Sequence, residues 1–251
     1  MADCRERIMS EEYGDYIVEF DGRGENAIEQ YRDYCPQIIG DRYFVVNENL
    51  ENVAGFEQRD YPYTAIPKLY GLMDSTSVSA TGAVRLQNQT GFELTGRGVI
   101  VGFIDTGIEY TNDAFKNSVG RTRIINIWDQ TVNSGNPPEG FLYGTEEINE
   151  ALENENPLEI VNHTDENGHG TFLAGVACGS YNEQQDFIGS APESVIAMVK
   201  LKPAKRYLKE YYLVENDEIA FQENDIMLAA AYLRSLRIKY DMPLVIVLGL
   251  G

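Results

Sequence analysis

An apolar run, VIVGFID, occupies residues 99–105 and ends in an acid. Nearly continuous runs of this kind are typical of a strand in a parallel sheet that helices cover on both faces. The segments that follow alternate between helical and strand-like patterns, at 171–178, 195–201, 224–236 and 244–248. This β-α-β-α-β order predicts an α/β fold with a parallel, doubly wound sheet, in which sites form at the carboxyl ends of strands. Asp105 lies at such an end.

The beginning of the chain has a different pattern. Residues 16–20, 25–34 and 42–46 are predicted to form a strand, a helix and a strand, and glycines and prolines bound these segments. We therefore expect a small α+β module at residues 1–74.

A change of composition separates this module from the rest of the chain. Residues 75–94 are predicted to be a linker and processing region, and the small polar residues at 74–82 are the expected place of protease cleavage. Residues 95–251 then form the larger domain. Within it, the Gly-, Pro-, Asn- and Glu-rich segment 133–157 is expected to be a solvent-exposed insertion.

Composition narrows the choice of partners and compartment. The 251 residues carry 20 Lys+Arg against 40 Asp+Glu, a formal net charge of -20. This negative charge repels phosphate backbones and anionic lipids, which argues against nucleic-acid or membrane partners. No apolar stretch approaches the roughly 20 residues of a membrane helix, and residues 1–25 lack the basic start and apolar core of a signal peptide. We therefore expect an intracellular protein.

Neither the cysteines nor the acids form a pattern typical of a metal site. The three cysteines, Cys4, Cys35 and Cys178, are an odd number without metal-ligand spacing, which suits a reducing compartment better than a disulfide framework. Cys178 is predicted to be a buried, small apolar residue. The acidic surplus permits a Ca²⁺ site, but the chain has no dense loop of alternating carboxylates. We predict no metal ligand and no required cofactor.

Two segments carry the candidate chemistry. In FIDTGIE the strand delivers Asp105 to the edge of the sheet, and Gly107 lets the backbone turn sharply. In NGHGTFLAG, His169 opens a helix whose unpaired N–H groups and positive dipole end disfavour a charged imidazole. A neutral His169 can accept a proton from a nucleophile, and a buried carboxylate on its other nitrogen would fix its tautomer. Asp105 and His169 are therefore a candidate catalytic pair.

Each motif alone also has an ordinary structural interpretation. A carboxylate after an apolar strand often only forms a turn, and a histidine beside a glycine is more often a loop residue than a catalyst. The two motifs occur in order on strand-to-helix connections of one alternating pattern, which favours function. Asp-Thr-Gly is also the motif of aspartic peptidases. Those are antiparallel β proteins that need a second such motif, and this chain has none.

Four segments in order, VIVGFIDTGIEYTNDAF, NGHGTFLAGVACG, IGSAPESVIAMVKL and PLVIVLGLG, resemble the catalytic-domain blocks of the subtilisin-like serine peptidases. The resemblance covers residues 95–251 and implies the triad order Asp, His, Ser. It implies that Asp105 orients the histidine and that His169 is the general base. The strand segment that pairs with the main chain of a protein or peptide substrate is matched by Gly249, Leu250 and Gly251.

A narrower resemblance is to the clostridial germination proteases, the Csp-like subtilases. It rests on RTRIINIWDQT at residues 121–131 and on the 64 positions (169 - 105) between Asp105 and His169. It implies that residues 1–74 are a ferredoxin-like prodomain that assists folding and can remain bound to the catalytic domain; an independent binding module is the alternative. The resemblance also suggests association with spores.

The chain departs from the family at the nucleophile. The family's serine, in a Gly-Thr-Ser setting, and its oxyanion-hole asparagine are absent from these 251 residues. Ser180 and Ser190 each follow a glycine, but neither lies in a Gly-Thr-Ser sequence. Because the chain ends directly after an apolar strand, without a helix to cover it, we expect a truncated fragment.

Three functions are consistent with these features. The first is part of a serine endopeptidase whose nucleophile lies outside this chain, and the chain alone is then predicted to be inactive. The second is a catalytically inactive pseudoprotease scaffold that binds a peptide or a partner protease; the retained Asp105 and His169 argue against it. The third is a chaperone or inhibitor of a peptidase, acting through residues 1–74.

Overall fold

The computed structural model describes most of the chain, at residues 4–20, 28–51, 62–72, 94–132, 140–181 and 188–251. The chain forms two compact units. The first unit joins Met1–Gly71 to Lys202–Ala231, and the second joins Leu72–Leu201 to Tyr232–Gly251. The predicted cleavage segment 74–82 lies outside the described residues, and the predicted domain boundaries stay a prediction.

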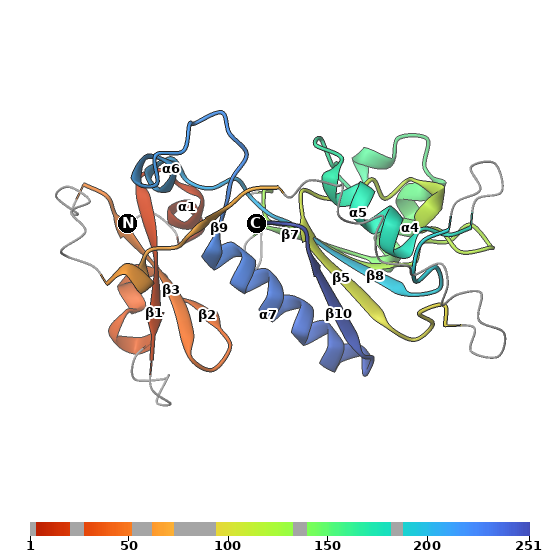
Figure 1. Ribbon diagram of the computed structural model, residues 1–251, viewed down its shortest axis with the longest axis horizontal. Coiled ribbons are helices and arrows are strands. Elements are labelled where there is room, and N and C mark those ends of the chain that lie inside the picture. Colours follow the sequence, from red (N-terminus) through yellow and green to blue (C-terminus); the bar gives the residue numbers. More distant parts are fainter. Residues whose placement is uncertain (1–3, 21–27, 52–61, 73–93, 133–139, 182–187) are drawn as a thin grey trace. The chain divides into compact units, whose positions relative to one another are not determined.

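The first unit contains a three-stranded antiparallel sheet in the order β1-β3-β2 (Figure 1). Its strands are β1 (Tyr13–Glu19), β2 (Gln37–Ile39) and β3 (Tyr43–Asn49). The other described elements of the unit are α1 (Cys4–Met9), η1 (Arg32–Tyr34), η2 (Tyr63–Ala65), β4 (Leu69–Tyr70), α6 (Arg206–Tyr211), β9 (Phe221–Gln222) and the first half of α7 (Glu223–Tyr240). Tyr16, Phe44 and Val46 form a buried cluster on the sheet.

These elements confirm the two predicted strands of the module. In the predicted helix 25–34, residues 28–30 are helical and the 3-10 turn η1 follows them. The short strand β4 pairs in antiparallel fashion with β9, which lies about 150 positions later in the sequence. The ferredoxin-like arrangement stays a prediction.

Two of the three cysteines are paired, contrary to the sequence-based expectation. Cys4 of α1 and Cys35 form a disulfide with Cα atoms 5.3 Å apart and a sequence separation of 31. The third cysteine, Cys178, makes the total odd, so the total did not indicate that the other two are paired. Cys178 is buried as predicted. The argument for a reducing compartment from unpaired cysteines therefore no longer holds.

A buried carboxylate lies at the centre of the first unit. Asp15 of β1 is 1% exposed and accepts hydrogen bonds from four side chains: Asn47 at 2.5 Å, Gln222 at 2.5 Å, Lys205 at 2.7 Å and Asn224 at 3.4 Å. The Tyr207 hydroxyl donates to the Asp15 carbonyl oxygen at 2.9 Å and accepts from its N–H at 2.7 Å. Burial raises the pKa of Asp15, but the charges of Lys205 and Lys202 outweigh it, so the pKa is lowered.

The second unit contains a five-stranded sheet in the order β10-β5-β8-β6-β7. Its strands are β5 (Ile100–Asp105), β6 (Ile124–Asp129), β7 (Phe141–Gly144), β8 (Val195–Lys200) and β10 (Leu244–Leu248). The pairings β10-β5, β5-β8 and β8-β6 are parallel, whereas β6-β7 is antiparallel. The predicted parallel sheet is therefore confirmed for four strands, and β7 is an antiparallel addition at one edge.

Helices lie on both faces of this sheet (Figure 1). Val101 and Phe103 of β5 pack in one core cluster with residues of α4 (Thr145–Glu153) and α5 (His169–Cys178). Gly102, whose side of the strand is opposite, faces Leu233 in the second half of α7. The doubly wound arrangement thus follows from the alternation along β5. Two 3-10 turns, η4 (Asp113–Phe115) and η5 (Pro157–Glu159), complete the unit.

The expected exposed insertion at 133–157 is wrong for the segment that forms β7 and α4. Residues 133–139 lie outside the described residues, but β7, α4 and η5 occupy much of the rest. Ile148 and Ala151 of α4 are fully buried at i, i+3 spacing, and the Glu147 carboxylate accepts the Gly144 N–H at 2.6 Å. The many acids of this segment therefore belong to the outer face and first turn of an amphipathic helix.

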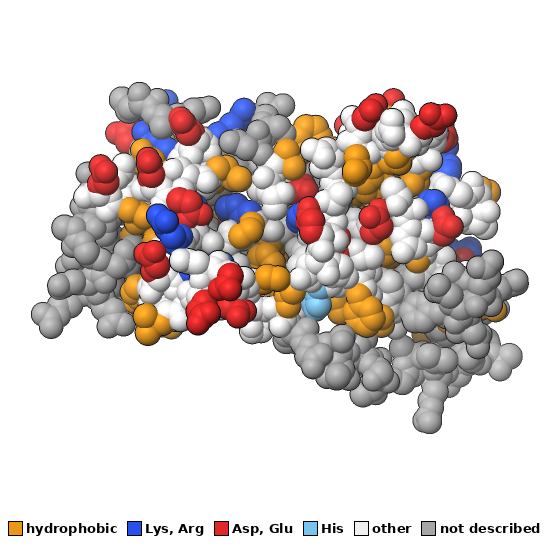
Figure 2. All heavy atoms as spheres, turned by 90° about the horizontal axis from the view of Figure 1, so that it is seen from above, with side chains coloured by type: hydrophobic (Ala, Val, Ile, Leu, Met, Phe, Trp, Pro, Cys, Tyr) orange, Lys and Arg blue, Asp and Glu red, His pale blue; other side chains and the backbone are white. Residues whose placement is uncertain are grey.

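The exposed side chains reflect the excess of acidic residues in the sequence, whereas one edge strand exposes apolar side chains. Acidic side chains are spread over the face shown in Figure 2 and are accompanied by fewer basic ones. On β10, which lies at the edge of the sheet, Val245, Ile246 and Leu248 are exposed. None of the helices in the described ranges is long and apolar enough to cross a membrane.

Candidate active site

Three charged side chains lie at the carboxyl ends of adjacent parallel strands. Asp105 ends β5, Lys200 ends β8 and Asp129 ends β6, and Lys200 is in register with both acids. All three residues are almost completely buried. This edge is where a doubly wound sheet places a functional site.

The structure brings Asp105 and His169 together as predicted. His169 Nδ1 lies 2.8 Å from Asp105 Oδ1, and the Thr106 N–H donates to the same oxygen at 2.8 Å. The Asp105 side chain is 1% exposed, whereas that of His169 is 13% exposed. Burial raises the pKa of Asp105, and the hydrogen bonds from His169 and Thr106 only partly offset this. A buried acid thus orients an imidazole that a reactant can approach.

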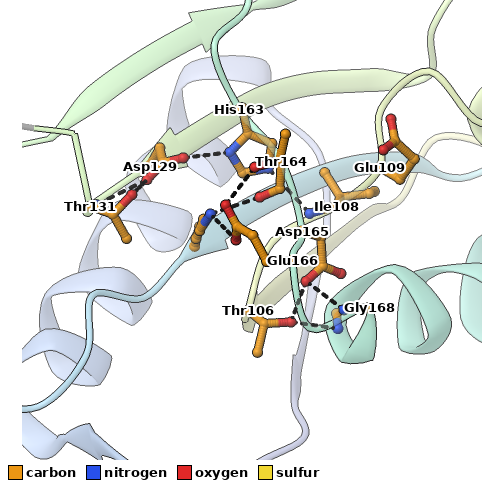
Figure 3. A network of polar contacts seen from close by, with 12 residues as sticks. Thr106, Ile108, Glu109, Asp129, Thr131, His163, Thr164, Asp165, Glu166 and Gly168 are labelled. Carbon is orange, nitrogen blue, oxygen red and sulfur yellow. Dashed lines mark hydrogen bonds and ion pairs between the residues drawn. The ribbon is translucent and has the colours of Figure 1, made fainter. Parts of the chain in front are cut away.

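Asp165 fixes the start of the helix that carries His169 (Figure 3). Its carboxylate accepts the N–H of Gly168 at 3.0 Å, and both the N–H and the hydroxyl of Thr171 at 2.8 and 2.6 Å. The Thr106 hydroxyl donates to it at 2.7 Å and accepts the Gly170 N–H at 3.0 Å. Burial raises the pKa of Asp165, but these hydrogen bonds outweigh it and the pKa is lowered. An ionised Asp165 therefore caps α5 and ties it to the residue after Asp105.

Glycines allow the close approach of these segments. A Cβ at Gly170 would lie 2.2 Å from the Gly107 carbonyl oxygen and 3.1 Å from the Asp105 Cβ. No side chain fits at that distance from backbone, so the first turn of α5 can reach the β5 loop only with a glycine at this position.

The predicted substrate-binding residues follow β10, and the first of them, Gly249, lies at the same site. A Cβ at Gly249 would lie 2.2 Å from Leu173 Cδ1, 3.0 Å from Asp105 Oδ2 and 3.0 Å from His169 Cε1. Leu250 forms an isolated antiparallel bridge with Leu72 and is buried, while Gly251 is exposed. The backbone at Gly249 therefore lies directly beside the Asp-His pair.

Sequence reasoning missed the residues that support the pair. Asp165, Thr106 and Thr171 were not singled out, although an acid shortly before a glycine-flanked helix start is a recognisable capping pattern. His163 and Asp129 form a second Asp-His pair, with His163 Nδ1 2.6 Å from Asp129 Oδ2. Their separation of 34 positions gives no local pattern, so only the three-dimensional structure shows that they meet.

Within the described ranges, no group of three or more His, Cys, Asp or Glu side chains is arranged to hold a metal ion.

Comparison with known proteins agrees with this geometry. The subtilase (peptidase S8) family model matches residues 96–227, just over half of the chain. The subtilisin-like protease SBT3.6 of Arabidopsis thaliana is 26% identical over 168 residues, which cover 62% of this chain and 21% of that protein. The CspB protease of Clostridium perfringens is 37% identical, with a TM-score of 0.54 over 66% of this chain and 32% of that structure. The chain thus spans a third or less of these two relatives. From the family match and the Asp105–His169 geometry together, the chain belongs to the subtilase family.

Proposed function

We propose that this chain is part of a subtilisin-like serine endopeptidase, in which Asp105, His169 and a serine outside these 251 residues hydrolyse peptide bonds. The observation that carries the proposal is the 2.8 Å contact between His169 Nδ1 and the buried Asp105 carboxylate. In an Asp-His-Ser triad this contact holds the imidazole in the tautomer and orientation that catalysis needs.

The proposed reaction uses the two nitrogens of His169 differently. Nδ1 donates to Asp105, so Nε2 accepts the proton of the serine hydroxyl as its oxygen attacks the substrate carbonyl carbon. The Asp105 carboxylate stabilises the imidazolium, which then gives the proton to the leaving amine. A water molecule releases the acyl group by the same sequence of proton transfers. Asp105 stays ionised throughout.

The nucleophile gives the direct test of this proposal. We expect the 251-residue chain alone to hydrolyse labelled casein no faster than its His169→Ala variant, because without its serine a triad enzyme loses on the order of 10⁶-fold in rate. The product of the complete reading frame that contains this chain should hydrolyse casein and react with a fluorophosphonate at one serine. Casein turnover by the 251 residues themselves, abolished by His169→Ala, would show that the nucleophile is assigned wrongly.

We also propose that residues 1–74 are a prodomain that stays bound after processing. Two contacts support this. In the first unit, Asp15 is bound by Lys205, Tyr207 and Gln222 from beyond the linker. In the second unit, Leu72 forms a single antiparallel bridge with Leu250, next to Gly249 and the catalytic pair, and such backbone pairing is what we expect for a peptide in the cleft.

The prodomain proposal predicts a break in the chain. Intact mass spectrometry of the active protein should find two fragments, with cleavage within residues 74–82, and both should elute together in gel filtration. The same preparation carrying His169→Ala should remain uncut if processing is autocatalytic. An active protein without a break between residues 67 and 90 would exclude processing at this linker.

The resemblance to the Csp-like branch leads us to propose an intracellular, spore-associated role as well. The catalytically inactive scaffold is less consistent with the site, because a scaffold needs neither the Asp105–His169 contact nor the capping of α5 by Asp165.

A further inference from the structure

The second Asp-His pair has no part in the proposed reaction. His163 Nδ1 lies 2.6 Å from Asp129 Oδ2, and the Ile108 N–H donates to His163 Nε2 at 3.2 Å (Figure 3). The side chains of His163 and Asp129 are 0% and 2% exposed. Asp129 also accepts the Thr131 N–H and hydroxyl at 2.9 and 2.5 Å. Both ring nitrogens of His163 are thus engaged inside the protein.

The contacts assign the tautomer of His163. A backbone N–H can only donate, so Nε2 must carry a lone pair toward Ile108. The proton therefore lies on Nδ1 and is donated to the Asp129 carboxylate. Burial raises the pKa of Asp129, but the hydrogen bonds from His163 and Thr131 outweigh it, so the pKa is lowered and the acid is ionised. Asp129 selects the tautomer that can accept the Ile108 N–H.

Hydrogen bonds to other parts of the second unit hold almost every residue of the segment 161–166, which contains His163. The Tyr110 hydroxyl donates to the Val161 carbonyl oxygen at 3.1 Å, and the Tyr143 hydroxyl to that of Asn162 at 3.2 Å. Lys200 Nζ donates to the Thr164 carbonyl oxygen at 2.8 Å and to the Glu166 carboxylate at 2.7 Å. This segment leads directly into α5 and His169, so its position fixes the position of the imidazole.

The same segment is linked repeatedly to the loop that follows Asp105. The Ile108 N–H bonds to His163, Thr106 bonds to Asp165, and the Gly170 N–H bonds to Thr106. The Asp105–His169 contact and the hydrogen bond from the Glu109 N–H to the Thr171 hydroxyl at 2.8 Å join the same two segments. His163 supplies the link at Ile108, three residues after Asp105.

We propose that His163 is a positioning residue for the Asp105–His169 pair. As a neutral acceptor set by Asp129, it holds the Ile108 N–H and keeps the 105–108 loop against the segment that enters α5. Loss of this acceptor leaves a buried N–H without a partner and lets the loop move. Its catalytic consequence rests on the proposed peptidase function, whereas its effect on the Asp105–His169 contact does not.

Two substitutions separate the two bonds of His163. In His163→Asn the amide nitrogen lies near the position of Nδ1 and can donate to Asp129, but nothing reaches Ile108. In His163→Gln the amide oxygen lies near the position of Nε2 and can accept the Ile108 N–H, but the donor to Asp129 is lost. Thr131→Val is the matched control, because it removes a hydroxyl bond to Asp129 and leaves the Ile108 link intact.

The chain's two histidines make the measurement simple. In the ¹⁵N-histidine-labelled 251-residue chain, we expect two low-field Nδ1–H resonances, one for each Asp-His pair. The resonance of His169 should be lost or broadened in His163→Asn and retained in His163→Gln and Thr131→Val. In the complete peptidase, His163→Asn should lower kcat about 10- to 100-fold with little change in KM, and His163→Gln should lower it less.

The outcomes separate the two proposals. An unchanged His169 resonance in a folded His163→Asn variant would overturn the positioning role. If that variant does not fold, amide exchange at Ile108 in the unsubstituted chain decides: strong protection supports the link, and exchange as fast as in an exposed loop excludes it. If His163→Asn loses the His169 resonance but the complete protein has no peptidase activity, the positioning role stands and only the proposed function is rejected.

Discussion

Replacement of His169 by alanine in the complete peptidase is expected to lower kcat by on the order of 10⁶-fold, with little effect on KM. His169 Nδ1 is held 2.8 Å from Asp105, and without the imidazole no group takes the proton of the nucleophile. Asp105→Asn should cost about 10⁴-fold, because an amide in this position favours the wrong tautomer of His169. Combining the two substitutions should cost little more than His169→Ala alone, since the pair acts as a unit.

Steady-state hydrolysis of a peptide anilide would measure these effects. Ser190→Ala is a suitable control, because Ser190 is exposed, follows a glycine and should not supply the nucleophile. Its activity should equal that of the unsubstituted enzyme. A His169→Ala enzyme that keeps more than a tenth of the activity would rule out the proposed general base.

Lys205→Met is expected to destabilise the first unit by about 3–5 kcal/mol. Lys205 is 3% exposed, and its Nζ donates to Asp15 at 2.7 Å and to the Tyr13 carbonyl oxygen at 3.0 Å. Methionine has a similar volume but leaves the buried Asp15 carboxylate without its nearest countercharge. Urea unfolding at pH 7, followed by circular dichroism, would measure the loss.

Acid should reduce this difference between Lys205→Met and the unsubstituted chain. In the folded chain the pKa of Asp15 lies below its ordinary value of 3.8. A lowered folded-state pKa contributes stability above the unfolded-state pKa of about 3.9, and this stability is lost as pH falls through the folded-state value. Without Lys205 the folded-state pKa rises, so the two proteins should differ most near neutral pH and least below about pH 3.

Arg206→Met provides the control for this effect. Arg206 is the next residue, but its side chain is 66% exposed and pairs with Glu210 at i+4. Such a pair contributes about 0.3–0.5 kcal/mol. Equal destabilisation by Arg206→Met and Lys205→Met would show that the Asp15 cluster has no special weight. Asp15→Asn combined with Lys205→Met should recover part of the loss, because no charge is then left unpaired.

The sequence predicts those elements whose pattern is local. β5, β8 and β10 are continuous apolar runs, and α5 and α7 have helical spacing, so each was located within a few residues. α4 was missed because its polar residues outnumber Ile148 and Ala151, its two buried apolar residues. The Cys4–Cys35 disulfide was missed because an odd cysteine count argued against pairing.

The candidate active site likewise contains residues that a local sequence pattern predicts and residues that it does not. Asp105 and His169 were found because each lies in a motif that marks its own strand end or helix start. The contacts of Asp165 with Thr106 and of His163 with Asp129 span 59 and 34 positions, and sequence spacing carries no signal for them, whereas the bonds of Asp165 to Gly168 and Thr171 are local. Composition and periodicity alone do not show that the motifs of Asp105 and His169 belong to one site. The resemblance of four ordered segments to the family's blocks indicates that they do.

The strand order also sets a sequence of events during synthesis. Ile100 of β5 pairs with Val195 of β8 and Leu244 of β10, which lie 95 (195 - 100) and 144 (244 - 100) positions later. Because the chain is synthesised from its N-terminus, β5 leaves the ribosome long before either neighbour exists. Loops of that length then close slowly. β1 and β3, by contrast, pair across 36 positions (49 - 13) at their outermost contact, Tyr13 with Asn49. The pairing of β1 with β3 can therefore form while β5 still lacks its neighbours, although Lys205, Tyr207 and Gln222, which bind Asp15 of β1, are synthesised only after β5. The longer β5 stays unpaired, the more aggregation of nascent chains we expect.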